Sequence, residues 1–126
     1  MKHFFLLFTG IFICLLLSCL SGKERDAQKQ IREKYKAEEV RIHFPEEEIQ
    51  DSVRNIAEII VIKSQTLDQT RGAFEDCLDI ATLFFKALSD RNRYFGVRVI
   101  ISNPSEGSRV SGLSKSFFYE KNLLEH

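Results

Sequence analysis

Residues 74–88 read FEDCLDIATLFFKAL, and apolar side chains recur in this stretch at steps of three and four residues. That spacing places them on one side of a helix and leaves the charged residues on the other side. We therefore predict an amphipathic helix over about residues 70–90, whose wide apolar face is typical of a helix that covers a sheet. The apolar positions are Phe74, Cys77, Leu78, Ala81, Phe84, Phe85 and Leu88.

The residues on both sides of this helix predict the strands of the sheet. Apolar and polar residues alternate from Tyr94 to Ile101, and they alternate again from Val40 to Phe44 until Pro45 interrupts the pattern. A period of two is the pattern of a strand with one buried face. Val110 is a candidate start for the next strand, and residues 116–120 predict another.

Residues 46–62 support two interpretations. Ile49, Val53, Ile56 and Ile60 fit one face of a helix that starts in the acidic turn 46–48. Against this, residues 59–62 form a β-branched run, which packs better on a pleated sheet than in a helix. We favour a strand at about 57–64, joined to the first strand by a loop or a short helical turn.

The order of predicted elements indicates an α+β fold. A helix over residues 23–37, with a thin apolar stripe of Ala27, Ile31 and Tyr35, precedes the first strand, although a partly ordered charged spacer is the alternative. The order helix, strand, strand, helix, strand, strand predicts a small antiparallel sheet of about four strands with helices packed on one face. We expect the last residues, 121–126, to fray.

The amino terminus has the pattern of an export signal. Lys2 and His3 precede an apolar run from Phe4 to Leu17, which ends in Ser18 and Cys19. A basic start, a hydrophobic stretch of about 7–15 residues and a small residue at the cleavage point are typical of a secretory signal peptide.

Leu16, Leu17, Ser18 and Cys19 together resemble the lipobox of bacterial lipoproteins. This resemblance implies a diacylglycerol thioether on Cys19, cleavage between Ser18 and Cys19, and acylation of the new amino terminus. Leu17 is bulkier than the usual residue at its position and resembles the looser lipoboxes of spirochaetes and Bacteroidetes. Two or three acyl chains anchor a protein stably, whereas one chain is marginal.

Two alternatives to lipidation remain open. The chain could be secreted without lipid after cleavage near Ser18 or Ser21, or residues 4–20 could stay as an uncleaved anchor. A membrane-crossing helix needs about 20 apolar residues, and this stretch is slightly short. By resemblance, Leu20 after the lipidated cysteine favours the outer membrane over the inner membrane, with the domain facing the periplasm or the exterior.

The sequence thus divides into a signal peptide (1–18), a lipidated tether (19–30) and one small α+β domain (31–126). This layout resembles, in architecture alone, small helix-on-sheet domains of uncharacterised bacterial lipoproteins. The 18 basic and 18 acidic residues balance, which argues against nucleic acid as a partner. Of the three cysteines, the resemblance implies that Cys14 leaves with the signal and that Cys19 carries lipid. Cys77 would then remain alone, and we favour a packed thiol over a reactive nucleophile because it lies in an apolar helical stripe.

The chain shows no recognisable catalytic or metal-binding pattern. His43 with the glutamates 46–48 is the only cluster of metal-ligand types, and it has too few histidines and cysteines for a zinc site. A triad of Ser64, His43 and Asp68 has no supporting motif of the G-x-S-x-G kind. We expect no enzyme activity, no cofactor and no bound metal.

The best candidate for a binding site is a basic patch after the long helix. Arginine side chains beside a tyrosine could hold an anion or a carboxylate of a partner. The sequence therefore predicts a lipid-anchored envelope lipoprotein, non-enzymatic, with a small binding or structural domain for an envelope partner. The alternatives are a tethered inhibitor or immunity-type protein and, less well supported, a small envelope hydrolase. The patch comprises Arg91, Arg93, Tyr94 and Arg98.

Overall fold

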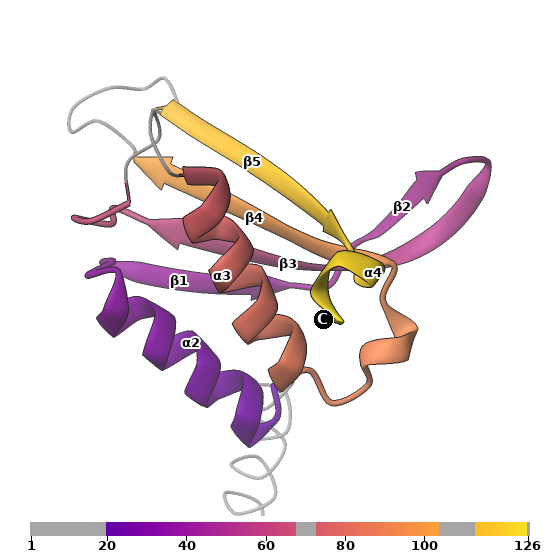
Figure 1. Ribbon diagram of the computed structural model, residues 1–126, viewed down its shortest axis with the longest axis horizontal. Coiled ribbons are helices and arrows are strands. Elements are labelled where there is room, and N and C mark those ends of the chain that lie inside the picture. Colours follow the sequence, from indigo (N-terminus) through magenta and orange to yellow (C-terminus); the bar gives the residue numbers. More distant parts are fainter. Residues whose placement is uncertain (1–19, 68–72, 104–112, 126) are drawn as a thin grey trace, which may run out of the picture.

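The computed structural model describes residues 20–67, 73–103 and 113–125, which form an α+β domain with a mixed, open, five-stranded sheet (Figure 1). The predicted signal peptide, Ser18, Cys19, Val110 and His126 lie outside these residues. The described elements are α2 (Gly22–Lys34), β1 (Glu39–His43), β2 (Glu46–Ile49), β3 (Ser52–Ile62), α3 (Ala73–Ala87), the 3₁₀ turn η1 (Arg91–Arg93), β4 (Gly96–Asn103), β5 (Leu113–Glu120) and α4 (Lys121–Leu124).

The sheet is mixed because α3 connects its two central strands. The strand order is β1-β3-β4-β5, with β2 paired to β3 alone. β1 and β3 are antiparallel, as are β4 and β5, whereas β3 and β4 are parallel. The α+β class is confirmed, but the prediction of an antiparallel sheet is wrong at this central pair. A helical crossover returns the chain to the edge where β3 began, so the next strand runs in the same direction.

Residues 46–56 form a hairpin instead of the predicted loop or helical turn. Glu46–Ile49 pair with residues 52–55, so β3 begins earlier than the predicted strand at 57–64. The two turn residues, Gln50 and Asp51, have φ angles of 54° and 64°. Both central residues of a type I′ hairpin turn need positive φ, which the Asn-Gly pair signals and Gln-Asp does not. Sequence patterning therefore missed this turn.

The core lies between the sheet and the two long helices, α2 and α3, which cover the same face (Figure 1). The apolar stripe predicted for this helix is largely confirmed, because Leu78 is partly buried and five of the seven positions are buried: Cys77, Ala81, Phe84, Phe85 and Leu88. Phe74 is the exception at 54% exposed, although its ring contacts Phe117 and Tyr119. The strands contribute Val40, Ala57, Ile59, Val61, Val97, Val99, Ile101 and Tyr119.

Both ends of the described chain are more firmly packed than predicted. The stripe of Ala27, Ile31 and Tyr35 is buried as expected. However, α2 begins at Gly22, so residues 22–30, which the sequence analysis placed in the tether, lie in a packed helix. At the other end, Leu124 on α4 is 1% exposed and belongs to the core, so the expected fraying is wrong for this turn.

Glu24 fixes the start of α2 against the turn that follows α3. Its carboxylate accepts hydrogen bonds from the backbone N–H of Ser21, at 3.1 Å, and from the N–H and hydroxyl of Ser89, at 3.1 and 3.0 Å. Ser21 Oγ accepts from the Glu24 N–H in return, which completes a capping box. Glu24 is only 5% exposed, so these bonds replace the water that its carboxylate would otherwise hold.

Replacing Glu24 with alanine should destabilise the domain by about 2 kcal/mol, because it removes the side-chain half of the capping box and leaves the Ser21 and Ser89 donors without an acceptor. Urea denaturation followed by circular dichroism measures the change. Glu33→Ala, an exposed substitution on the same helix, is the matched control. Equal stability of the two variants would contradict this role of Glu24.

Candidate functional site

A cavity of about 310 Å³ opens where three separate chain segments meet at one end of the sheet. The backbone of Phe95 ties these segments together: its N–H donates to Asn55 O at 2.9 Å, and its carbonyl accepts from the Lys121 N–H at 3.0 Å. The walls are therefore fixed by main-chain bonds between the hairpin, the start of β4 and α4. The lining residues are Val53, Arg54, Asn55, Asn92, Arg93, Tyr94, Phe95, Glu120, Lys121 and Asn122.

The lining of this cavity is cationic. Arg54, Arg93 and Lys121 oppose one carboxylate, that of Glu120, which leaves a net charge of +2. Within residues 20–67, 73–103 and 113–125, no carboxylate forms an ion pair with any of the three cations. Unneutralised cations that share a concave surface are a ready site for an anion.

Arg54 is the most constrained of these cations. Its guanidinium carbon lies 5.1 Å from the centre of the Phe95 ring, in a cation–π contact. Its Nε is buried and has no hydrogen-bond acceptor among the residues that the structure describes. Buried donors of this kind are nearly always paired in native proteins, so an unpaired one needs a physical explanation.

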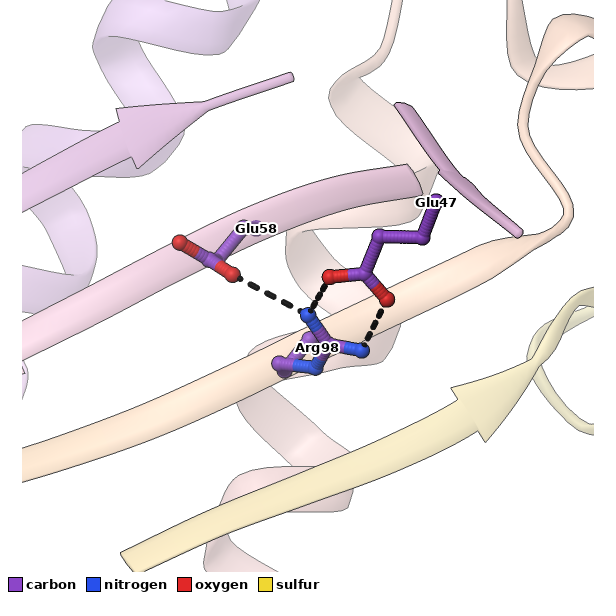
Figure 2. A network of polar contacts seen from close by, with 3 residues as sticks. All are labelled: Glu47, Glu58 and Arg98. Carbon is purple, nitrogen blue, oxygen red and sulfur yellow. Dashed lines mark hydrogen bonds and ion pairs between the residues drawn. The ribbon is translucent and has the colours of Figure 1, made fainter. Parts of the chain in front are cut away.

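The residue opposite Arg54 in the hairpin explains why the donor is unpaired. Glu47 is the direct cross-strand partner of Arg54, where an ion pair would be expected. Figure 2 shows that both carboxylate oxygens of Glu47 instead face Arg98, a residue of β4. Arg98 thus takes the acceptor that Arg54 would otherwise use.

Arg98 joins the hairpin to two central strands through a shared charge network (Figure 2). Its Nη1 donates to Glu47 Oε1 and to Glu58 Oε2, the latter at 3.3 Å, and its Nη2 donates to Glu47 Oε2 at 2.6 Å. The bond from Arg98 lowers the pKa of the Glu47 carboxyl. A bidentate arginine–carboxylate pair is directional, so it fixes where the hairpin lies over the sheet.

The structure divides the patch that the sequence predicted. Arg93 and Tyr94 line the cavity, whereas Arg91 is exposed on η1 outside its lining. Arg98 lies in the network with Glu47 and Glu58. Sequence reasoning missed Arg54, because its strand was predicted to begin later, and Lys121, because its segment was expected to fray.

His43 and Ser64, which were considered for catalysis or metal binding, do not line this cavity. His43 is exposed on β1 and pairs in register with Glu58, whose carboxylate contacts Arg98. Ser64 Oγ accepts from the Leu67 N–H at 3.0 Å and donates to the Tyr35 carbonyl, a local structural use. Asp68 lies outside the described residues. No group of three potential metal ligands occurs within the described ranges.

Cys77 is fully buried on α3, as the sequence predicted for a packed thiol. Burial, with a smaller contribution from the negative charge of Asp76, raises the pKa of the thiol to about 12. Because the thiolate is the reactive species, Cys77 is unreactive in the folded protein at neutral pH.

Comparison with known proteins gives no match to a protein-family model, to a curated protein or to a solved structure. Among the described residues, no helix combines the length and the apolar character that a membrane crossing requires. The functional argument therefore rests on the residues themselves.

The Arg98–Glu47 pair should make stability depend on pH in the acid range. A lowered carboxyl pKa means that Glu47 contributes its full stabilisation above the ordinary pKa of a glutamate. This contribution disappears as the pH falls through the lowered value. We expect Glu47→Gln to reduce the free energy of unfolding by about 1 kcal/mol at pH 7 and by progressively less in acid.

Urea denaturation of the wild type and Glu47→Gln across pH 3 to 7 measures this difference. Glu48→Gln, an exposed neighbour on the same strand, is the control and should follow the wild type at every pH. A constant gap between the wild type and Glu47→Gln throughout the range would refute the assignment.

Proposed function

We propose that the protein is a lipid-anchored component of a bacterial cell envelope, non-enzymatic, whose α+β domain binds another envelope component. The anchor is the diacylglycerol that the Leu16-Leu17-Ser18-Cys19 pattern implies for Cys19. The binding surface is the cationic cavity, whose described lining has a net charge of +2 and contains the unpaired Nε of Arg54.

The position of the first described helix carries this proposal. Ser21 caps α2 and lies two residues after Cys19. Cleavage before Cys19 would thus remove the apolar segment and leave every described helix and strand intact. Every described helix and strand follows Cys19, as expected of a processed lipoprotein.

The same spacing determines how the domain would sit on the membrane. Two extended residues span at most about 7 Å, so the start of α2 would lie against the lipid headgroups. Glu24 binds Ser89, so the turn that leads to η1 lies at this end of the domain too. Lys23 and Arg25 in the first turn of α2 and Arg91 in η1 are exposed basic side chains of these segments, and each basic residue near an anionic bilayer contributes about 1 kcal/mol of attraction.

Radiolabelled palmitate should enter the wild-type protein in its bacterial host and should not enter Cys19→Ala. The reason is that lipidation of the cysteine precedes cleavage and supplies the acylated amino terminus. Gel fluorography of immunoprecipitated protein measures the label.

Cys77→Ala, which removes the buried thiol of the domain, is the matched control and should label as the wild type does. Label that persists in Cys19→Ala, or that is absent from the wild type, would exclude lipid anchoring at this position.

Because Ser21 lies only two residues after Cys19, we expect the domain to keep one orientation on the membrane. Two variants, each with a fluorophore at a single position, can measure this orientation. Lys23→Cys lies at the start of α2, and Gln65→Cys lies beyond its other end, because the Gln65 N–H donates to the Lys36 carbonyl. A helix of 13 residues separates the two ends by about 20 Å. Buried Cys77 stays unlabelled in both variants.

With the lipidated protein in vesicles that carry nitroxide-labelled headgroups, the fluorophore at position 23 should be quenched severalfold more than the one at position 65. Equal quenching at both positions would show that the domain is not held by its α2 end, even where palmitate labelling succeeds.

A further inference from the structure

We propose that the cavity between the hairpin, the η1 turn and α4 is a binding site for a phosphate group, with the guanidinium of Arg54 as its principal donor. The argument uses only the described side chains and does not depend on the lipid anchor.

The hydrogen-bonding capacity of Arg54 is the first step. Its Nε is a buried donor with no acceptor among the residues described, and its ring contact with Phe95 holds the guanidinium plane in place. An arginine fixed in this way loses little conformational freedom when it binds a tetrahedral or planar oxyanion. Because this atom is buried, a ligand oxygen would reach it only if the neighbouring side chains shift, and donation from Nε would then supply the missing hydrogen bond.

The charge of the lining selects the kind of oxyanion. Arg54, Arg93 and Lys121 against Glu120 leave a net charge of +2. A phosphate monoester carries about −1.5 to −2 at pH 7 and would neutralise this charge, whereas a carboxylate would neutralise only half of it. The three cations come from three different segments, so they can surround a tetrahedral group.

The size and the remaining lining indicate more than a bare ion. A cavity of about 310 Å³ is at the lower end of small-molecule sites. Its asparagines, Asn55, Asn92 and Asn122, offer amide donors and acceptors to hydroxyl or carbonyl groups next to the phosphate. The ligand is therefore a polar phosphate compound, either soluble or the headgroup of a phospholipid.

Nuclear magnetic resonance of the Arg54 Nε–H group tests the site directly, because this signal reports on the donor that the proposal uses. The protein as purified from its host is titrated in neutral detergent micelles with inorganic phosphate, glycerol 3-phosphate and acetate at constant ionic strength. We expect a saturable shift of the Arg54 signal with both phosphate compounds and at least about tenfold weaker binding of acetate.

Two further variants change cations on η1 and α4 and leave Arg54 itself in place, so their effect on phosphate binding does not depend on the structure around a substituted Arg54. Arg93→Gln and Lys121→Gln should each weaken phosphate binding by about tenfold or more while the Arg54 signal persists. Arg41→Gln, which removes a cation paired with Glu39 on β1, is the matched control and should leave phosphate affinity unchanged.

A final comparison separates the two sources of the phosphate. Phosphatidic acid, whose headgroup is a phosphate monoester, identifies a lipid ligand if it saturates the Arg54 shift in the micelles, whereas a shift with soluble glycerol 3-phosphate alone identifies a soluble ligand; either result supports the site. An Arg54 signal that phosphate does not move, or that acetate moves with equal affinity, would overturn the proposal.

Discussion

The bidentate pair between Arg98 and Glu47 is the interaction on which both the shape and the candidate site depend. Arg98 lies on a central strand, and Glu47 lies on the short strand of a hairpin that pairs with β3 alone. Without this pair, the hairpin would be held to the sheet mainly through the continuation of β3. The pair also determines which cations remain free, because it removes the carboxylate that lies opposite Arg54. The Arg98–Glu47 pair thus fixes the hairpin wall of the cavity and leaves the Nε of Arg54 without an acceptor.

Two buried charged groups, Glu24 and the Nε of Arg54, differ in whether the described protein supplies their hydrogen-bond partners. Glu24 is buried and accepts hydrogen bonds from both Ser21 and Ser89, so α2 has a defined start. Arg54 is also enclosed, yet its Nε has no acceptor in the described chain. Burial of either group costs desolvation free energy. Hydrogen bonds within the described protein offset that cost for Glu24 but not for Arg54. This contrast separates a structural polar cluster from one that is open to a ligand.

Sequence patterns predicted those parts of the fold in which side-chain periodicity and burial agree. The stripe that contains Phe84 and Phe85 on α3 and the alternation in β4 correspond to buried faces. The hairpin escaped prediction because its turn, Gln50-Asp51, adopts positive φ without glycine or asparagine. The parallel pairing of β3 with β4 also escaped, since periodicity within a strand does not determine the direction of its neighbour.

The sequence could predict which residue types form the candidate site, but not which of those side chains are already paired with carboxylates. The sequence indicated an arginine-rich patch that included Arg93, but membership of a site depends on which carboxylates are already engaged. Arg98 belongs to the predicted patch by position, yet its charge is satisfied by Glu47 and Glu58. No local pattern distinguishes it from Arg54, since the partners lie on other strands.

The unpaired Nε of Arg54 is the strongest reason to regard the cavity as functional rather than as a gap in packing. Leaving a buried donor unsatisfied costs about 1–3 kcal/mol, and a cation–π contact such as that with Phe95 returns about 0.5–2 kcal/mol. The contact therefore compensates for part of the cost and at the same time holds the side chain in one orientation. A leucine or methionine could cover Phe95 without leaving a buried donor unsatisfied. The extra property of arginine at this position is its ability to bind an anion.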